Sequence, residues 1–167
     1  MRLRRWVALL LLAASLGAHA QGKVEVAEWK EVEAPPPPAF DASRVLPFEV
    51  SAMSSLKFGI DPQTLSIGKD GILRYVMVAT NSSGAMNAMY EGIRCSTGEY
   101  KTYARYYPGS GWNKASSAQW QPLRGTRSTS TYYFSKQGGC PDSGPAVRID
   151  EVLHELKRST YIKFDHN

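Results

Sequence analysis

The chain has 167 residues, of which 43% are hydrophobic, and carries a net charge of +5 at pH 7. This length suffices for one domain with a real hydrophobic core. The positive charge does not indicate nucleic-acid binding. Arg2, Arg4 and Arg5 lie in a segment that we expect to be removed, which leaves 17 of the 20 basic residues against 15 acidic ones.

Residues 1–20 have the three parts of a cleavable secretory signal. Residues 1–5 are positively charged, 6–17 are apolar, and Ala18-His19-Ala20 is a small-x-small cleavage site. The apolar part has about a dozen residues, whereas a helix needs about 20 to span a bilayer. We therefore expect a soluble mature protein that begins at Gln21, has no integral membrane span, and is periplasmic or peripheral to the envelope. No cysteine follows the cleavage site, as a lipoprotein would require.

Residues 21–45 are predicted to form an acidic, proline-rich tether. Their proline run, 35–38, favours an extended polyproline conformation. Trp29 either begins a short helical turn or docks on the domain, and the sequence leaves both alternatives open. The remainder, 46–167, is predicted to be a single domain.

The region from 46 to 107 has the pattern of an antiparallel β-meander. Turn signals lie at Asp70-Gly71, at Asn81-Ser82-Ser83-Gly84 and at Ser96-Thr97-Gly98. The strand candidates between them are 55–59, 63–67, 72–80, 85–95 and 99–107.

The turn lengths predict how the strands pair. A four-residue turn after Thr80 places that residue opposite Ala85, and hence Arg74 opposite Glu91. Opposite charges at paired positions form cross-strand ion pairs, so we predict a structural Arg74–Glu91 pair.

The C-terminal region predicts a helix that covers one face of the sheet. The apolar residues Ile149, Val152, Leu153 and Leu156 recur at helical spacing. The segment 126–134 suits a strand by its composition but could equally be a helix. The predicted fold class is α+β: an antiparallel β-meander of about five strands, with the C-terminal helix packed on one face.

Cys95 and Cys140 are the two cysteines of the chain. In an oxidising compartment such a pair is expected to form a disulfide. Its loop of about 45 residues would contribute roughly 4 kcal/mol in the chain-entropy model. The alternatives are catalytic: a nucleophilic Cys95 activated by His154, or Glu91 acting with Glu99 as an acid/base pair.

Basic and aromatic side chains are interleaved between residues 90 and 120, within a region, 94–136, that has seven bases and one acid. Such a mixture can bind sugars or polyanions by stacking and charge, although aromatic residues are also common sheet components. The candidate ligand-binding surface consists of Tyr90, Arg94, Tyr100, Lys101, Tyr103, Arg105, Trp112, Lys114 and Trp120.

No motif for a metal or cofactor occurs, since His154 and His166 lack ligand spacing and no phosphate-binding or dinucleotide fingerprint is present. We therefore expect no cofactor and no metal site.

The segment Tyr90-Glu91-Gly92-Ile93-Arg94-Cys95-Ser96-Thr97-Gly98-Glu99-Tyr100-Lys101 resembles the signature of the cryptic neisserial protein-like family. Asp70-Gly71-Ile72-Leu73-Arg74-Tyr75 before it, and Trp112 and Trp120 after it, follow the order of that family. The resemblance covers about 27–158. It implies a small exported protein of Gram-negative bacteria, from a family without an established activity. In that family the second cysteine usually follows a Tyr-Phe pair directly, whereas residues 135–139 intervene here.

These observations favour an exported cell-envelope protein with a non-catalytic binding or structural role. One alternative is a protein that binds anionic polymers or glycans through the basic, aromatic 94–136 surface. The other is an enzyme that uses Glu91 or Cys95. For a binding role, we expect the partner of the protein to be either an envelope component or an anionic polymer.

Overall fold

The computed structural model describes residues 28–51, 54–125, 129–140 and 148–164 of the chain. The predicted signal, 1–20, and its cleavage site lie outside these residues, so export remains a prediction. Within the described ranges, no helix is long and apolar enough to cross a membrane.

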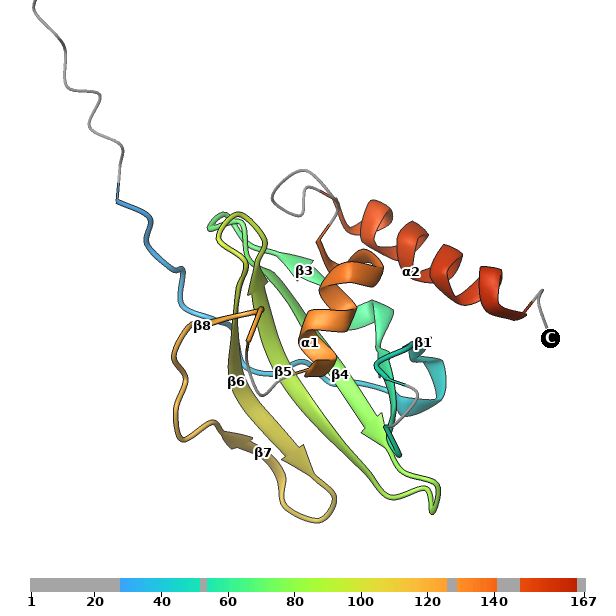
Figure 1. Ribbon diagram of the computed structural model, residues 1–167. Helices are drawn as coiled ribbons and strands as arrows, with labels where there is room; N and C mark the ends of the chain where they lie inside the picture. The colour runs from blue at the N-terminus through green and yellow to red at the C-terminus, as the bar shows by residue number, and fades with distance from the viewer. Residues whose placement is uncertain (1–27, 52–53, 126–128, 141–147, 165–167) are drawn as a thin grey trace, which may run out of the picture.

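The centre of the molecule is an antiparallel sheet built on three consecutive long strands (Figure 1). They are β4 (Leu73–Thr80), β5 (Met86–Arg94) and β6 (Glu99–Tyr107), joined by tight turns as the sequence predicts. Gly98 has a φ of 67° in the second turn, a backbone conformation that favours glycine.

Shorter strands extend this sheet on both sides. β1 (Leu46–Phe48) and β2 (Lys57–Ile60) continue it beyond β4, and β7 (Gly111–Lys114) continues it beyond β6. β3 (Ser66–Ile67) pairs with β4, and β8 (Gln121–Pro122) pairs with β6. The described residues thus form eight strands rather than about five, because such short edge strands leave little alternation in the sequence.

Helical segments cover one side of the sheet. The segment 126–134, whose composition is compatible with a strand or a helix, contains helix α1 (Thr129–Phe134). This helix runs into a π-type turn, η3 (Ser135–Gly139). The C-terminal helix is confirmed as α2 (Ile149–Phe164), with acidic residues in its first turn. The predicted α+β class, an antiparallel sheet with the C-terminal helix, is therefore confirmed. Two short 3-10 helices, η1 (Ala42–Arg44) and η2 (Pro62–Thr64), precede and follow β2 in the chain.

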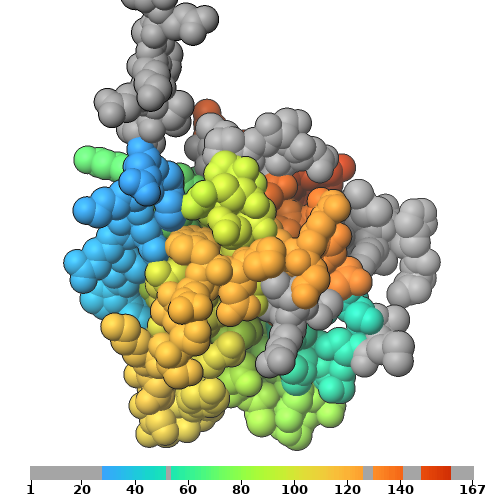
Figure 2. All heavy atoms as spheres, turned by 60° about the vertical axis from the view of Figure 1, so that its left-hand side comes forward, coloured from blue at the N-terminus to red at the C-terminus, as the bar shows by residue number. Residues whose placement is uncertain are grey.

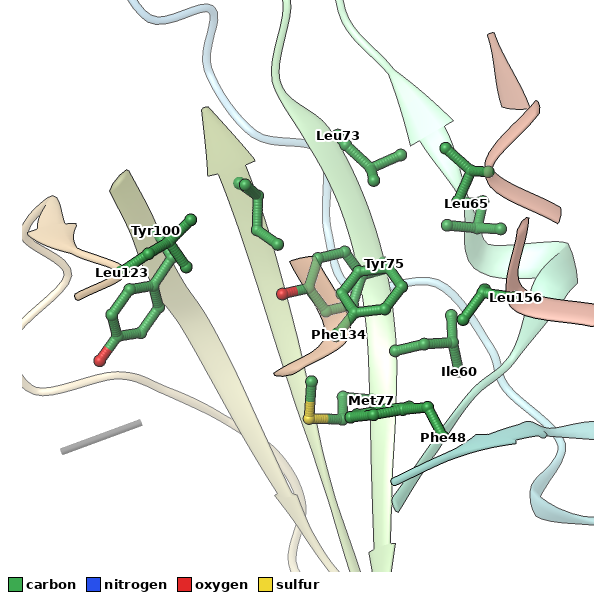
Figure 3. Close-up of a cluster of buried hydrophobic side chains, with 12 residues drawn as sticks. Phe48, Ile60, Leu65, Leu73, Tyr75, Met77, Tyr100, Leu123, Phe134 and Leu156 are labelled. Atoms are coloured by element: carbon green, nitrogen blue, oxygen red, sulfur yellow. The ribbon is translucent and has the colours of Figure 1, made fainter. Parts of the chain in front are cut away.

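The main core lies between the sheet and these helices (Figure 3). Phe134 of α1 is fully buried, and its ring centroid lies 4.6 Å from that of Tyr75 on β4. This burial explains why 129–134 is helical despite its strand-like composition, since tertiary packing overrides local propensity. Val152 and Leu156 of α2 are also fully buried, as their helical spacing predicts.

A second, smaller core lies on the opposite side of the sheet. It contains Val76, Val78, Ala88, Tyr90 and Ala104, with Phe40 and Val45 packed against it. Figure 1 shows the N-terminal segment crossing behind the sheet, on the side away from α1. The sheet is therefore covered on both sides, by helices on one and by an irregular segment on the other.

The predicted register between β4 and β5 is wrong by one residue. Thr80 pairs with Met86 rather than with Ala85, and Arg74 pairs with Gly92 rather than with Glu91. The loop between the paired residues is 81–85, one residue longer than predicted. Asn81 stabilises it, since its carboxamide oxygen accepts hydrogen bonds from the backbone N–H groups of Ser83 and Ala85. A slip by one residue moves every side chain of a strand to the other face. Glu91 therefore lies on the helix side of the sheet, and Arg74 on the other side.

Between β5 and β6, near the turn, Arg94 pairs with Glu99 and Glu91 pairs with Thr102. The register shifts by one at an irregularity between Tyr90 and Glu91, beyond which Tyr90 pairs with Ala104. Bulges of this kind redirect side chains, and Tyr103 here points to the side opposite the helices.

Candidate functional site

The N-terminal segment docks on the sheet through residues 29–38, which we call the N-terminal strap. Of the two alternatives for Trp29, docking is confirmed, since its indole N–H donates to the carbonyl oxygen of Asp70 at 2.9 Å. The Arg94 guanidinium lies 3.9 Å from the centroid of the Trp29 ring, a cation–π contact. Trp120 meets the same ring edge-on at 5.9 Å. The part of the predicted tether that the structure describes is therefore held against the domain.

Glu31 is the second anchor of the strap. Its carboxylate accepts hydrogen bonds from the Lys101 ammonium at 2.9 Å, the Tyr103 hydroxyl at 3.0 Å and the Trp120 indole at 3.0 Å. Burial acts to raise the pKa of Glu31, but these donors outweigh it, so that its pKa is lowered. Glu31 is thus ionised and fully paired at neutral pH.

Asp70 joins the strap to the sheet. Its side chain is fully buried and binds the Arg74 guanidinium at 2.7 Å, while the Arg74 side chain is only 4% exposed. Asp70 also accepts from the backbone N–H of Val32 at 3.0 Å, and Arg74 donates to the carbonyl oxygen of Val32 at 3.0 Å. The predicted Arg74–Glu91 ion pair is therefore wrong, because Asp70, four residues earlier, is the partner of Arg74.

Glu91 is buried on the helix side and is held by three hydroxyl groups rather than by a cation. Thr131 of α1 donates to it at 2.7 Å, Thr102 of β6 at 2.9 Å, and Tyr75 of β4 at 3.2 Å. The residue is only 1% exposed, and burial raises the pKa of Glu91 even though the hydroxyl donors oppose this change. The cage joins α1 to the three central strands, β4, β5 and β6.

The raised pKa of Glu91 leads to a testable pH dependence. The folded state retains the proton more strongly than the unfolded state, so the contribution of Glu91 to stability is complete below its unfolded pKa and is lost as pH rises through the folded value. We expect Glu91→Gln to match the wild type within about 1 kcal/mol at pH 4, because the three hydroxyls can bond to the amide. At pH 8 the variant should be the more stable protein.

Urea unfolding at both pH values measures this difference. Glu151→Gln, at an exposed position of α2, is the matched control and should keep the wild-type pH profile. A Glu91→Gln variant that is destabilised equally at pH 4 and pH 8 would contradict the hydroxyl cage.

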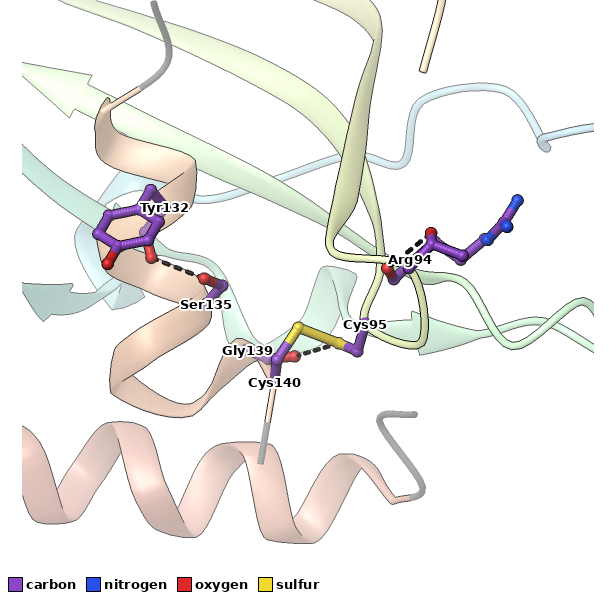
Figure 4. Close-up of a disulfide and its surroundings, with 7 residues drawn as sticks. Arg94, Cys95, Tyr132, Ser135, Gly139 and Cys140 are labelled. Atoms are coloured by element: carbon purple, nitrogen blue, oxygen red, sulfur yellow. Dashed lines mark hydrogen bonds between the residues drawn. A yellow bond between two sulfur atoms is a disulfide. The ribbon is translucent and has the colours of Figure 1, made fainter. Parts of the chain in front are cut away.

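The predicted disulfide is present between Cys95 and Cys140, whose Cα atoms lie 5.5 Å apart (Figure 4). Cys95 belongs to the β5–β6 turn, and Cys140 follows η3, so the bond fastens the end of the α1–η3 unit to the sheet. The residues 135–139, which intervene before the second cysteine, form the wide turn η3. Gly138 in this turn has a φ of 134° and lies so close to α2 that a Cβ atom there would be 3.0 Å from the Leu156 nitrogen.

A cavity of about 650 Å³ opens on the helix side of the sheet, beside α1. We call it the helix-side cavity. Arg105 and Lys114, both exposed, are the basic residues among its described lining, which contains no carboxylate. Neither residue has an ion-pair partner among the residues that the structure describes. The remaining lining combines hydroxyl, amide and apolar groups from Leu56, Phe58, Ala79, Asn87, Met89, Tyr100, Thr102, Tyr107, Asn113, Ala115, Ser116, Ser117, Gln121 and Ser130.

The nine residues of the predicted ligand-binding surface do not form one surface. Four of them are engaged by the strap: Arg94, Lys101, Tyr103 and Trp120. The buried Tyr90 and the half-buried Trp112 lie on the strap side of the sheet, whereas Tyr100 and Arg105 line the helix-side cavity. Lys114, at the edge strand β7, borders cavities on both sides.

Trp29, Glu31 and Asp70 are site residues that the sequence analysis did not assign. Trp29 alone carried a signal, since a tryptophan in an acidic, proline-rich segment is unlike a solvated tether. The partners of Glu31 are 70 to 89 residues away in the chain, so no local pattern could identify them. In the described part of the chain, no group of three or more His, Cys, Asp or Glu residues could hold a metal ion.

The model of the CNP1-like family matches residues 24–157, which include the strap, the sheet and most of α2. No curated protein and no solved structure matches the chain.

Proposed function

This chain belongs to the CNP1-like family, and we propose that it is an exported, non-catalytic protein of the Gram-negative cell envelope that binds an anionic polymer. The ligand is held in the helix-side cavity. We propose further that its relatives include the cryptic neisserial protein-like proteins whose signature it resembles. The N-terminal signal pattern and the Cys95–Cys140 disulfide, a bond typical of oxidising compartments, support export to the periplasm.

A non-catalytic role is supported by the state of the two residues that an enzyme would use. Cys95 is in a disulfide and has no thiol to act as a nucleophile. Glu91 is 1% exposed and has three hydroxyl partners, so its carboxyl group lies out of reach of a substrate. Both groups are used to hold α1 against the sheet.

The observation that carries the binding proposal is the charge of the helix-side cavity. Arg105 and Lys114 are its described charged residues, and both are cations without an ion-pair partner there. Sulfate, phosphate and carboxylate groups bind such cations through charge-assisted hydrogen bonds. The hydroxyl and amide groups beside the cations supply the further bonds that a sugar backbone would need, and the volume is within the range of ligand sites.

Heparin, a sulfated polysaccharide, is the probe for this proposal. The protein should be purified from the periplasmic fraction, where its first residue by N-terminal sequencing is expected to be Gln21. We expect retention on a heparin column at physiological salt. Arg105→Ala should weaken the affinity about tenfold, since a hydrogen bond to a charged group contributes about 1.5–3 kcal/mol.

Lys136→Ala is the matched control, because Lys136 is an exposed base of the same 94–136 region that lies outside the described lining of the cavity. This variant should elute with the wild type. A wild-type protein that is not retained would contradict the proposal. Equal losses of heparin affinity in Arg105→Ala and Lys136→Ala would also contradict it, because they would indicate a general effect of charge.

A further inference from the structure

Beneath the proline run of the strap lies a second cavity, which we call the strap cavity, of about 700 Å³. It faces the side of the sheet opposite α1, where the strap lies on the molecular surface (blue in Figure 2). Residues 34–37 form one wall, and aromatic rings of Tyr90, Tyr103 and Trp112 face them from β5, β6 and β7. The volume is within the usual range for small-molecule sites.

The hydroxyl group of Tyr90 is the feature that points to a ligand. Tyr90 is only 1% exposed, and its hydroxyl has no hydrogen-bond partner among the described residues. Buried polar groups nearly always have a partner, and leaving one without a partner destabilises the folded state. Desolvation raises the pKa of Tyr90, so the phenol keeps its proton and can donate a hydrogen bond at any physiological pH.

The charges around the strap cavity are of both signs. Lys101 and Lys114 lie in its lining together with Glu31 and Glu33, in contrast to the carboxylate-free lining described for the helix-side cavity. Balanced charges do not select an anion. They offer both donors and acceptors, which suits an uncharged ligand rich in hydroxyl groups.

The aromatic rings narrow the class of ligand further. A pyranose ring has an apolar C–H face that packs on an aromatic ring, and a rim of hydroxyl groups that require hydrogen bonds. Trp112 is half-buried at the edge strand β7, with its ring centroid 5.7 Å from that of Phe40 and 5.5 Å from that of Tyr106. This cluster holds the indole ring in a fixed orientation beside the cavity.

We propose that the strap cavity binds a ring of a neutral saccharide, which packs against Trp112 and accepts a hydrogen bond from the Tyr90 hydroxyl. This site is distinct from the proposed anion site, because the ligand is uncharged and lies on the other side of the sheet. The proline run of the strap encloses the bound ring from the solvent side.

Titration of the full mature chain with chitotetraose and with cellotetraose, two neutral oligosaccharides, tests the proposal. Calorimetry and tryptophan fluorescence should show saturable binding of at least one of them. Tyr90→Phe removes a single oxygen atom and should weaken that binding about tenfold. The same variant should have a higher melting temperature than the wild type, because the hydroxyl has no hydrogen-bond partner among the residues that the structure describes.

Two further variants make the result decisive. Tyr132→Phe, on α1 on the opposite side of the sheet, should keep the wild-type affinity, and so should Arg105→Ala. The proposal is overturned if neither oligosaccharide binds, if Tyr90→Phe binds as the wild type does, or if Arg105→Ala abolishes saccharide binding. A lower melting temperature for Tyr90→Phe would also overturn it, since the hydroxyl would then have a structural partner.

Discussion

Replacing Asp70 with alanine is expected to lower the free energy of unfolding by about 3–5 kcal/mol, the usual effect of leaving one member of a buried ion pair without its partner. The Arg74 side chain is 4% exposed and cannot reach water without rearrangement of the strap. The substitution also removes the acceptor for the Val32 backbone N–H, so the strap should loosen together with the pair.

The pH dependence provides a second readout for Asp70. Burial opposes ionisation, but the hydrogen bonds from Arg74 and the backbone dominate, so the pKa of Asp70 is lowered. The stability that Asp70 contributes is therefore present above its unfolded pKa and is lost as pH falls through the folded value. In urea unfolding between pH 7 and pH 3, the free energy of unfolding of Asp70→Ala should decrease less with falling pH than that of the wild type.

Two comparison variants separate the ion pair from general effects. Asp70→Asn keeps an acceptor but not the charge, and it provides a folded protein if the alanine variant does not fold. Asp150→Ala breaks the exposed Arg148–Asp150 pair and should have no measurable effect. If Asp70→Ala and Asp150→Ala were equally stable, the buried Asp70–Arg74 ion pair would not stabilise the fold, and Asp70 would not anchor the strap.

Removal of the disulfide by the double substitution Cys95→Ala and Cys140→Ala should lower the free energy of unfolding by about 2–5 kcal/mol. The bond joins residues 45 positions apart, so its loss increases the freedom of the unfolded chain. In the folded state, α1 and η3 would then be held by non-covalent contacts, which include the buried Phe134, the Thr131–Glu91 hydrogen bond and the hydrogen bonds between Gln137 and Glu49.

Thiol titration and chemical unfolding measure the two parts of this prediction. The native wild-type protein should have no titratable thiol, and reduction with dithiothreitol should reproduce the stability of the double variant. Two reactive thiols in the native protein, or an unchanged unfolding midpoint after reduction, would contradict the structural role of the bond.

The sequence predicts the strands and the last helix well because their signals are local. Turn residues mark the ends of β4, β5 and β6, and the apolar spacing of Val152 and Leu156 identifies the buried face of α2. The register is less predictable, because it depends on the length of one loop. With the Asn81 side chain bonded to the backbone N–H groups of Ser83 and Ala85, the β4–β5 loop is one residue longer than the four-residue turn that the sequence suggests.

That single residue accounts for the largest error in the predicted site. With the slip, Glu91 moves to the helix side and meets hydroxyl groups, while Arg74 turns to the strap side and binds Asp70. Docking of Trp29 remained one of two alternatives for a different reason. An acidic, proline-rich composition is typical of solvated linkers, and only the contacts of Trp29 and Glu31 with distant residues distinguish this segment from one.

The location of a bound anionic polymer is the most direct test of the proposed function. NMR chemical-shift mapping of the mature protein during titration with a heparin hexasaccharide provides this measurement. We expect the largest shifts at the backbone amides of Thr102, Arg105 and Lys114, in the lining of the helix-side cavity. Shifts confined to the exposed face of α2 around Lys157 and Arg158, with none in the cavity, would contradict the account.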